Sequence, residues 1–204
     1  MALDLESDLG GVDVLVNVAC VAVVGEMVDT TVEDWEWVIG VNLWGPINTI
    51  SALLPGMLER ENGYILNVAS LGGLVSHGLL LAYCTTKFGL VGLSEALYQQ
   101  VREHNVHVTA FCPGIIRTPI AEHMKLRGYS SDKVNRSVSI LMKSPITMSA
   151  DRTGDLIVRA VKKQQPLVVT TVTGKLLAAL HRLSPGLVRF LLTKAHKLDN
   201  ATLR

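Results

Sequence analysis

Four short apolar runs, separated by helical patterns, constrain the fold of this 204-residue chain more than any other feature. In Val12–Ala19 the hydrophobic residues occupy both parities, which is typical of a strand buried on both faces. Parallel strands need crossover connections, and the helical patterns between the runs supply them. The sequence therefore predicts an α/β fold with a doubly wound parallel sheet, whose strands are Val12–Ala19, Tyr64–Val68, Val106–Phe111 and Leu167–Thr171.

Helices are predicted between these strands from capping residues and from apolar residues at helical spacing. Thr30 or Thr31 caps the first helix, and Gly45-Pro46 bends or divides it. The second and third helices are predicted over Tyr83–Glu103 and around Asp155–Lys163. Between Ile120 and Ala150 the sequence shows only a longer, partly polar segment.

Unusual polar and turn residues follow the predicted strands, where the ligand crevice of a parallel sheet lies. Asn17, Ser70 and Pro113-Gly114 each come after a strand. Tyr83 and Lys87 are four residues apart at a helix start, so their side chains share one face. An ammonium beside a phenol stabilises the phenolate and lowers its pKa from about 10. The pair alone is a weak signal, because two helix residues meet this spacing often by chance.

The residues around this pair resemble the short-chain dehydrogenase/reductase family. Ser70 precedes Tyr83 by the family's spacing, and Asn42 in VNLWGP matches the family's asparagine. Asn17-Val18-Ala19-Cys20 is similar to the family's Asn-Asn-Ala-Gly element, and the segment from Pro113 to Thr118 is similar to its Pro-Gly segment. The resemblance runs from Gly11 to about Thr171 and implies a Rossmann-like fold.

This resemblance also implies an NAD- or NADP-dependent oxidoreductase that interconverts a secondary alcohol and a ketone, or reduces an aldehyde. Tyr83 would act as the acid or base, and Ser70 would hydrogen-bond the substrate oxygen. Lys87 would lower the Tyr83 pKa and hold the nicotinamide ribose, while Asn42 would position a water that relays protons to Lys87. The remaining implied cofactor-binding residues are Asn17 and Ala19 on the adenosine side, and Pro113, Gly114, Ile116 and Thr118 towards the nicotinamide.

The chain departs from the family pattern in two places. Val18 and Cys20 stand where the family usually has asparagine and glycine, so a hydrogen bond and a permissive backbone position are expected to be lost. Only ten residues precede Gly11, too few for the family's first strand and glycine-rich turn. We therefore expect residues 1–172 to form an N-terminally truncated domain. The strand from Val12 would then be an edge that invites pairing, and we expect a homo-oligomer.

Composition excludes several other classes of function. The formal net charge is +1, which gives no global reason to expect a nucleic-acid partner. Cys20, Cys84 and Cys112 are far apart and form no CxxC pair, which favours a reducing, cytoplasmic setting without a disulfide framework. His104 and His107 lack a carboxylate or thiolate cluster at ligand spacing, so no metal site is predicted.

The C-terminal residues 173–204 form a basic, leucine-rich tail with two predicted amphipathic helices, broken at Ser184-Pro185-Gly186. Such a pair is suited to lie on a membrane surface, to cover the substrate crevice or to contact a partner subunit. With the apolar residues before it, the tail suggests a small, lipophilic carbonyl or alcohol substrate. A rival hypothesis is a non-catalytic remnant that keeps only an association surface.

Overall fold

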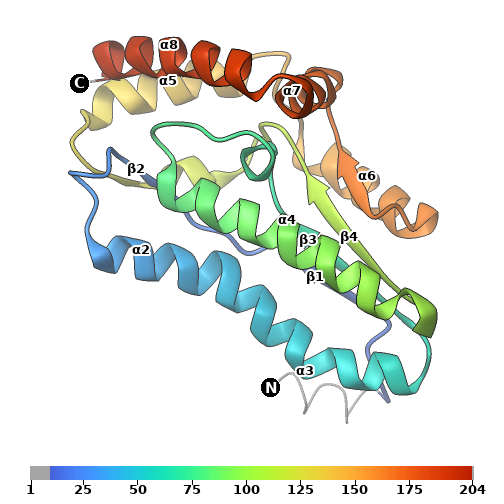
Figure 1. Cartoon of the computed structure of the whole chain (residues 1–204). Helices are drawn as coiled ribbons and strands as arrows, with labels where there is room; N and C mark the ends of the chain where they lie inside the picture. Colours follow the sequence, from blue (N-terminus) through green and yellow to red (C-terminus); the bar gives the residue numbers. More distant parts are fainter. Residues whose placement is uncertain (1–9, 204) are drawn as a thin grey trace.

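A four-stranded parallel sheet forms the centre of the structure, a computed structural model in which residues 10–203 are described (Figure 1). The predicted α/β fold with a parallel sheet is confirmed. Neighbouring strands are in register through pairs such as Leu15 with Ile65 and Ile65 with Val108. The strand order is β1 (Val14–Asn17), β3 (Gly63–Val68), β4 (Val106–Cys112) and β6 (Leu167–Val169).

Helices cover both faces of this sheet, because side chains along each strand alternate between the two faces. Ile65 and Val108 pack on one side against α3 (Gly45–Glu59) and α4 (Leu81–Val101). Leu66 and Phe111 pack on the other side against α6 (Ala150–Lys163). The two buried layers hold the strands rigidly, so the residues just beyond the strand ends are held in fixed positions.

The first helix begins where the capping residues predict and then changes its winding. Thr31 and Asp34 form a capping box at the start of α2 (Val32–Ile39). The helix continues through a π-helical turn, Gly40–Trp44, and enters α3 without a break. Gly45-Pro46 therefore does not divide the helix, and the predicted bend at these residues stays a prediction.

The continuous helix over Val32–Glu59 is long and apolar enough to span a bilayer by length and composition. Core helices of soluble proteins meet the same criterion, and this helix contributes Val38, Ile50 and Met57 to the buried core. Its length and composition are therefore only weak evidence for a transmembrane segment.

Three elements in the structure were not predicted from the sequence. β2 (Val23–Val24) and β5 (Lys125–Leu126) pair in parallel as a small second sheet, and α5 (Ser131–Lys143) forms within the partly polar segment. Buried Asp34 holds the small sheet to α2, because Arg127 donates to both its oxygens, over 2.7 and 2.9 Å. This contact anchors the segment that follows β4.

β1 is shorter than the predicted strand over Val12–Ala19, and within the described residues it lies at the edge of the sheet. Leu15 packs towards α3 and α4. By alternation, Val14 and Val16 point to the opposite face, where they are exposed. Within residues 10–203, no strand pairs with the outer edge of β1.

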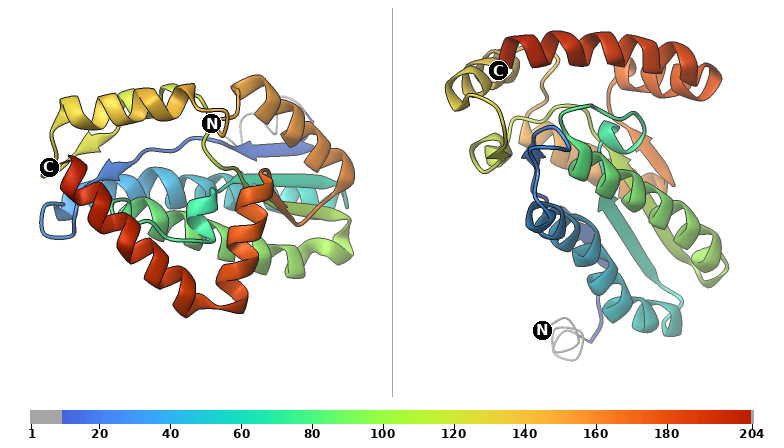
Figure 2. Two further views of the ribbon diagram at one scale, coloured as in Figure 1. Left: turned by 90° about the horizontal axis from the view of Figure 1, so that it is seen from above. Right: turned by 60° about the vertical axis from the view of Figure 1, so that its left-hand side comes forward.

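The tail forms two helices, α7 (Val172–Leu183) and α8 (Pro185–Leu203), that meet at the predicted break. Figures 1 and 2 show both helices lying across the end of the molecule towards which β4 points, and the C-terminal end of α8 approaches the start of α5. Val188 near the start of α8 is buried, and at the other end of α8 the Ser130 amide donates to the Leu203 carbonyl. The tail thus lies at the same end of the sheet as the carboxyl ends of the strands.

Candidate active site

Ser70 lies two residues beyond the end of β3, where the chain turns towards α4. Its backbone is extended, and its Oγ accepts a hydrogen bond from the Gly72 amide over 3.0 Å. The Leu71 amide donates to the Pro113 carbonyl and ties this turn to the end of β4. Because the Gly72 bond uses only an acceptor position, the Ser70 hydroxyl still has its proton to donate.

Tyr83 stands in the first turn of α4, directly opposite this serine. A Cβ atom placed on Gly72 would lie 3.3 Å from Tyr83 Cε1 and 3.4 Å from Ser70 Oγ, so the three residues enclose one small space. Burial raises the pKa of Tyr83 well above its usual value, and a hydrogen bond with Ser70 opposes that rise in part. The phenol is therefore protonated at neutral pH.

Lys87 lies one helical turn after Tyr83 and is almost completely buried. Its Nζ donates to the Val68 carbonyl over 2.8 Å and lies 5.6 Å from the Tyr83 ring centroid. Burial lowers the pKa of this lysine. The expected lowering of the Tyr83 pKa by Lys87 is not found in this structure, because desolvation of the phenol dominates and the ammonium points to a backbone carbonyl.

The Lys87 ammonium has more N–H groups than hydrogen-bond partners among the described residues. It carries three N–H groups, and among the described residues its only hydrogen-bond partner is the Val68 carbonyl. A buried cation with unused donors is costly unless another acceptor is supplied. Hydroxyl groups of a bound ribose would supply such acceptors, so this residue fits the nicotinamide-ribose end of a dinucleotide cofactor.

Asn42 occupies the π-helical turn and is completely buried. Its side chain binds the backbone of Val21 twice, accepting from the amide over 2.8 Å and donating to the carbonyl over 2.9 Å. It also donates to Thr86 Oγ1, which in turn donates to the Tyr83 carbonyl. Asn42 therefore connects the segment after β1 to the first turn of α4, and its predicted role in a water relay stays a prediction.

Asn17 ends β1 inside a polar network that crosses the sheet. It donates to Asn67 Oδ1 and accepts from Thr49, each over 2.8 Å, and Asn67 donates to Ser94. In this structure the Asn17 side chain therefore binds neighbouring elements. Ala19 lies just beyond the strand and is exposed. Their predicted contacts with the adenosine side of a cofactor stay predictions.

Cys20 lies close enough to Tyr83 and Lys87 to contribute to the raised pKa of the tyrosine and to oppose the lowered pKa of the lysine. The backbone of Cys20 is not in the left-handed region, so a residue other than glycine adds no strain there. The expected loss of a permissive backbone position is therefore wrong. Burial raises the pKa of the Cys84 thiol, and it raises that of Cys112 to about 12, which leaves both thiols unreactive at neutral pH.

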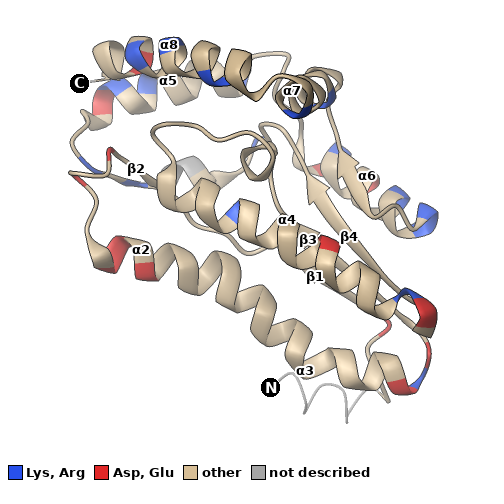
Figure 3. Cartoon of the chain, viewed as in Figure 1, with Lys and Arg blue, Asp and Glu red and all other residues tan. Residues whose placement is uncertain are grey.

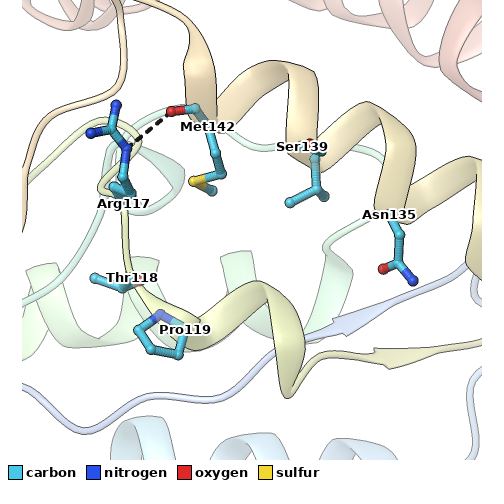
Figure 4. A pocket seen from close by; sticks show the side chains of 7 residues that line it. Arg117, Thr118, Pro119, Asn135, Ser139 and Met142 are labelled. Atoms are coloured by element: carbon cyan, nitrogen blue, oxygen red, sulfur yellow. Dashed lines mark hydrogen bonds between the residues drawn. The ribbon is translucent and has the colours of Figure 1, made fainter.

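The segment after β4 carries the other predicted cofactor contacts. The Gly114 amide donates to Thr170 Oγ1, and Ile116 pairs with Met148 in an isolated bridge. Thr118 lines a groove of about 740 Å³ between this segment and α5 (Figure 4). Arg117 Nε donates to the Met142 carbonyl of α5 over 3.1 Å and closes one end of the groove.

The structure thus brings Ser70, Tyr83 and Lys87 together directly and joins Asn42 to them through Thr86. Pro113 is tied to the Ser70 turn, while Thr118 lies farther along, in the groove against α5. Sequence reasoning missed Thr86, Gly72, Gly73 and Asn67. Two of these could have been found from the sequence, because the paired glycines Gly72-Gly73, two residues after Ser70, indicate a close approach of backbones.

Comparisons with known proteins show which sequences and folds the chain resembles. The short chain dehydrogenase family profile matches residues 2–127. The chain is similar to a D-beta-hydroxybutyrate dehydrogenase of Rhizobium meliloti, with 36% identity over 136 residues, which cover 64% of this chain and 53% of that protein. It covers 45% of a second hydroxybutyrate dehydrogenase, from Cupriavidus necator, and so spans about half the length of these curated relatives.

Solved structures give the same match at the level of the fold. A short-chain dehydrogenase from Streptomyces avermitilis superposes with a TM-score of 0.77 at 27% identity, covering 98% of this chain and 74% of that one. A short-chain dehydrogenase/reductase from Burkholderia phymatum, solved in complex with NAD, gives a TM-score of 0.80 at 22% identity, covering 91% and 72%.

Proposed function

We propose, on the premise that this chain belongs to the short-chain dehydrogenase/reductase family, that it is an NAD- or NADP-dependent oxidoreductase interconverting a secondary alcohol and a ketone, or reducing an aldehyde. One observation carries the proposal. The edge of the Tyr83 ring and the Ser70 Oγ both lie against Gly72, and the buried Lys87 ammonium lies 5.6 Å from the centroid of that ring.

Each side chain has a definite task in this proposal. Tyr83 donates its proton to the oxygen of a carbonyl substrate during reduction, and its raised pKa keeps that proton in place until then. Ser70 donates to the same oxygen and stabilises the negative charge that develops on it. In the oxidative direction Tyr83 must act as a base, which requires its pKa to fall when the site is loaded.

The cofactor contributes the hydride when it is bound. Lys87, with two unused N–H groups, would hold the ribose next to the nicotinamide. Ile116 and Thr118, after Pro113 and Gly114, would contact the nicotinamide end, and Asn17 and Ala19 the adenosine side. The groove beside Thr118 is lined partly by Val138 and Met142, which supports a small substrate with an apolar portion.

Tyr83→Phe tests the proposal directly. The purified chain is assayed for oxidation of NADH and NADPH with small ketones and aldehydes, and for the reverse reaction with 3-hydroxy acids and secondary alcohols. We expect the substitution to lower turnover at least about 100-fold, because it removes the transferred proton. Tyr98→Phe, the same change about four turns later in α4, is the matched control and should keep the parent rate. A Tyr83→Phe variant as fast as the parent would remove Tyr83 from the chemistry.

The competing candidate is a non-catalytic module that associates with other chains, and the exposed valines of β1 favour it. Binding of NADH and NADPH, followed by the fluorescence of the reduced nicotinamide, separates the two. Saturable binding that weakens in Lys87→Met supports the oxidoreductase, whereas no saturable signal with either nucleotide supports the module.

A further inference from the structure

The two tail helices present an unusual amount of apolar surface. Of the eighteen large apolar side chains exposed in the described residues, seven lie on α7 and α8. They recur every three, four or seven residues, so on each helix they form one stripe. The stripes consist of Val172, Leu176 and Leu183 on α7 and of Leu187, Phe190, Leu191 and Leu198 on α8.

Basic residues flank both stripes. Lys175 and Arg182 lie along one side of the α7 stripe, and Lys194 and Lys197 lie within and beside the α8 stripe. Lys194 Nζ lies 4.6 Å from the centroid of the Phe190 ring, so charge and apolar surface are interleaved. Long basic side chains in such positions can extend to anionic groups while their stems stay on apolar surface.

Charge is divided unevenly between the tail and the rest of the chain. Residues 172–204 contain six Lys and Arg against one Asp, whereas residues 1–171 contain thirteen against seventeen Asp and Glu. The single acidic residue, Asp199, does not offset the positive charge beside the stripes, because its carboxylate lies 3.3 Å from His77 Nε2 on the inner side of α8. Figure 3 shows the Lys and Arg positions along α7 and α8.

The inner side of α8 is held against the loop that leads to the active site. Besides the Asp199 contact, the His196 ring lies against Gly78, where a Cβ atom would approach it to 2.7 Å, and Asn200 donates to Glu26. These contacts fix which face of α8 points outward. The apolar stripe is thus a fixed feature of the surface, next to the loop between Ser70 and Tyr83.

We propose that α7 and α8 together form an interfacial anchor that lays its two apolar stripes onto an anionic lipid bilayer. Burial of the leucines and Phe190 in the headgroup region supplies the apolar part of the binding, and the flanking lysines and arginines supply the electrostatic part. A second copy of the chain is a less favourable partner for this surface, because pairing two such surfaces brings like charges together. An anionic bilayer neutralises them.

Co-sedimentation of the whole chain with vesicles tests this surface without cofactor or substrate. We expect binding to vesicles of phosphatidylcholine with phosphatidylserine, weaker binding to phosphatidylcholine alone, and a loss of binding at high salt. Lys194→Glu with Lys197→Glu should weaken binding by at least about 25-fold, at roughly fivefold for each charge removed. Leu187→Ser with Leu191→Ser should weaken it on both vesicle types.

Two control variants make the result specific. Ile140→Ser on α5 removes an exposed apolar side chain outside the tail, and Lys162→Glu with Lys163→Glu reverses two charges on α6. Both should bind like the parent. Vesicle binding that the controls weaken as much as the tail variants would overturn the proposal, as would no binding to anionic vesicles. An oligomer that only the tail variants dissociate, without vesicle binding, would assign the stripes to a second copy.

Discussion

Asn42 is a buried amide that is joined to the candidate catalytic residue Tyr83 without touching its side chain. Its Nδ2 uses both hydrogens, one on the Val21 carbonyl and one on Thr86, and Thr86 donates onward to the Tyr83 carbonyl. A buried amide that loses an acceptor pays the full cost of desolvation. The π-helical turn is what aims this side chain at α4, and such turns frequently occur at functional sites.

Thr86→Val should therefore destabilise the chain by about 1 to 3 kcal/mol, because the shape is kept while Asn42 Nδ2 loses a buried acceptor. Thr193→Val is the matched control. Thr193 likewise donates to a backbone carbonyl of its own helix, four residues back where Thr86 donates three residues back. It is exposed, however, and its replacement should change stability by less than about 0.5 kcal/mol. Urea unfolding followed by circular dichroism measures both. Equal effects of the two substitutions would show that the Asn42 bond contributes nothing.

The sequence predicted Ser70, Tyr83 and Lys87 through their resemblance to the short-chain dehydrogenase/reductase motifs, because the one-turn spacing of tyrosine and lysine is by itself a weak signal. It could not predict where the side chains of Asn42 and Asn17 point. Those depend on a π-helical turn and on the pairing of β1 with β3, which places Asn17 beside Asn67. The raised pKa of Tyr83 could not be predicted from the sequence either, because it arises from burial in the folded structure and not from residue spacing.

At the scale of elements, the approach of the Ser70 turn to α4 depends on Gly73. A Cβ atom there would lie 2.5 Å from the Lys87 carbonyl oxygen, which is backbone and cannot rotate away. Gly73→Ala should therefore push α4 from the turn, cost about 2 kcal/mol or more and lower catalytic turnover. Gly92→Ala, within α4, has no atom within 4 Å and should stabilise the helix by about 0.5 to 1 kcal/mol. Thermal melts of the two variants should move in opposite directions.

Asp34 joins α2 to β5 and makes the stability of the fold depend on pH in the acidic range. Its bidentate bond with Arg127 holds the pKa of this buried carboxyl far below its usual value. The unfolded chain binds the proton more tightly, so the contribution of Asp34 to stability is present above about pH 4 and is lost as the pH falls further. Asp34→Asn should lower stability at pH 7 and flatten the fall between about pH 4 and 2.

Glu36→Gln serves as the control for this prediction, because Glu36 lies on the same helix but is exposed. Its unfolding midpoint should follow the parent over the whole pH range. Urea midpoints measured at intervals from pH 7 to pH 2 give the comparison. If the urea midpoint of Asp34→Asn falls with pH as steeply as that of the parent, other carboxyls cause the acid sensitivity.

The long elements were predictable because their signals are local. β3, β4, α4 and the two tail helices have apolar periodicity and clear breaks, and their ends lie within a few residues of those predicted. α5 was missed because only Val134 of that helix is buried and its N-terminal Ser130 makes no capping bond. β2 and β5 are two residues each and exist only by pairing with each other, which no local pattern records.

At the scale of the whole molecule, the described sheet is asymmetric. One face is covered by α3 and α4 along its length, while α6 covers the other face only over the strands away from β1. Val14 and Val16 are therefore exposed beside a strand edge that has no partner among residues 10–203. Such an edge is a template for pairing with another chain.

The 204-residue chain should consequently self-associate in a manner that depends on concentration, and β1 should be the contact. Val14→Lys with Val16→Lys places charge beside the edge and should shift the population towards monomer, because pairing would bring the new charges together. Val158→Lys, an exposed valine on α6, should leave the distribution unchanged. Sedimentation velocity at several concentrations measures this for each variant. If the tail substitutions Leu187→Ser and Leu191→Ser dissociate the assembly while the β1 lysines do not, association runs through α8 and the edge of β1 is not the contact.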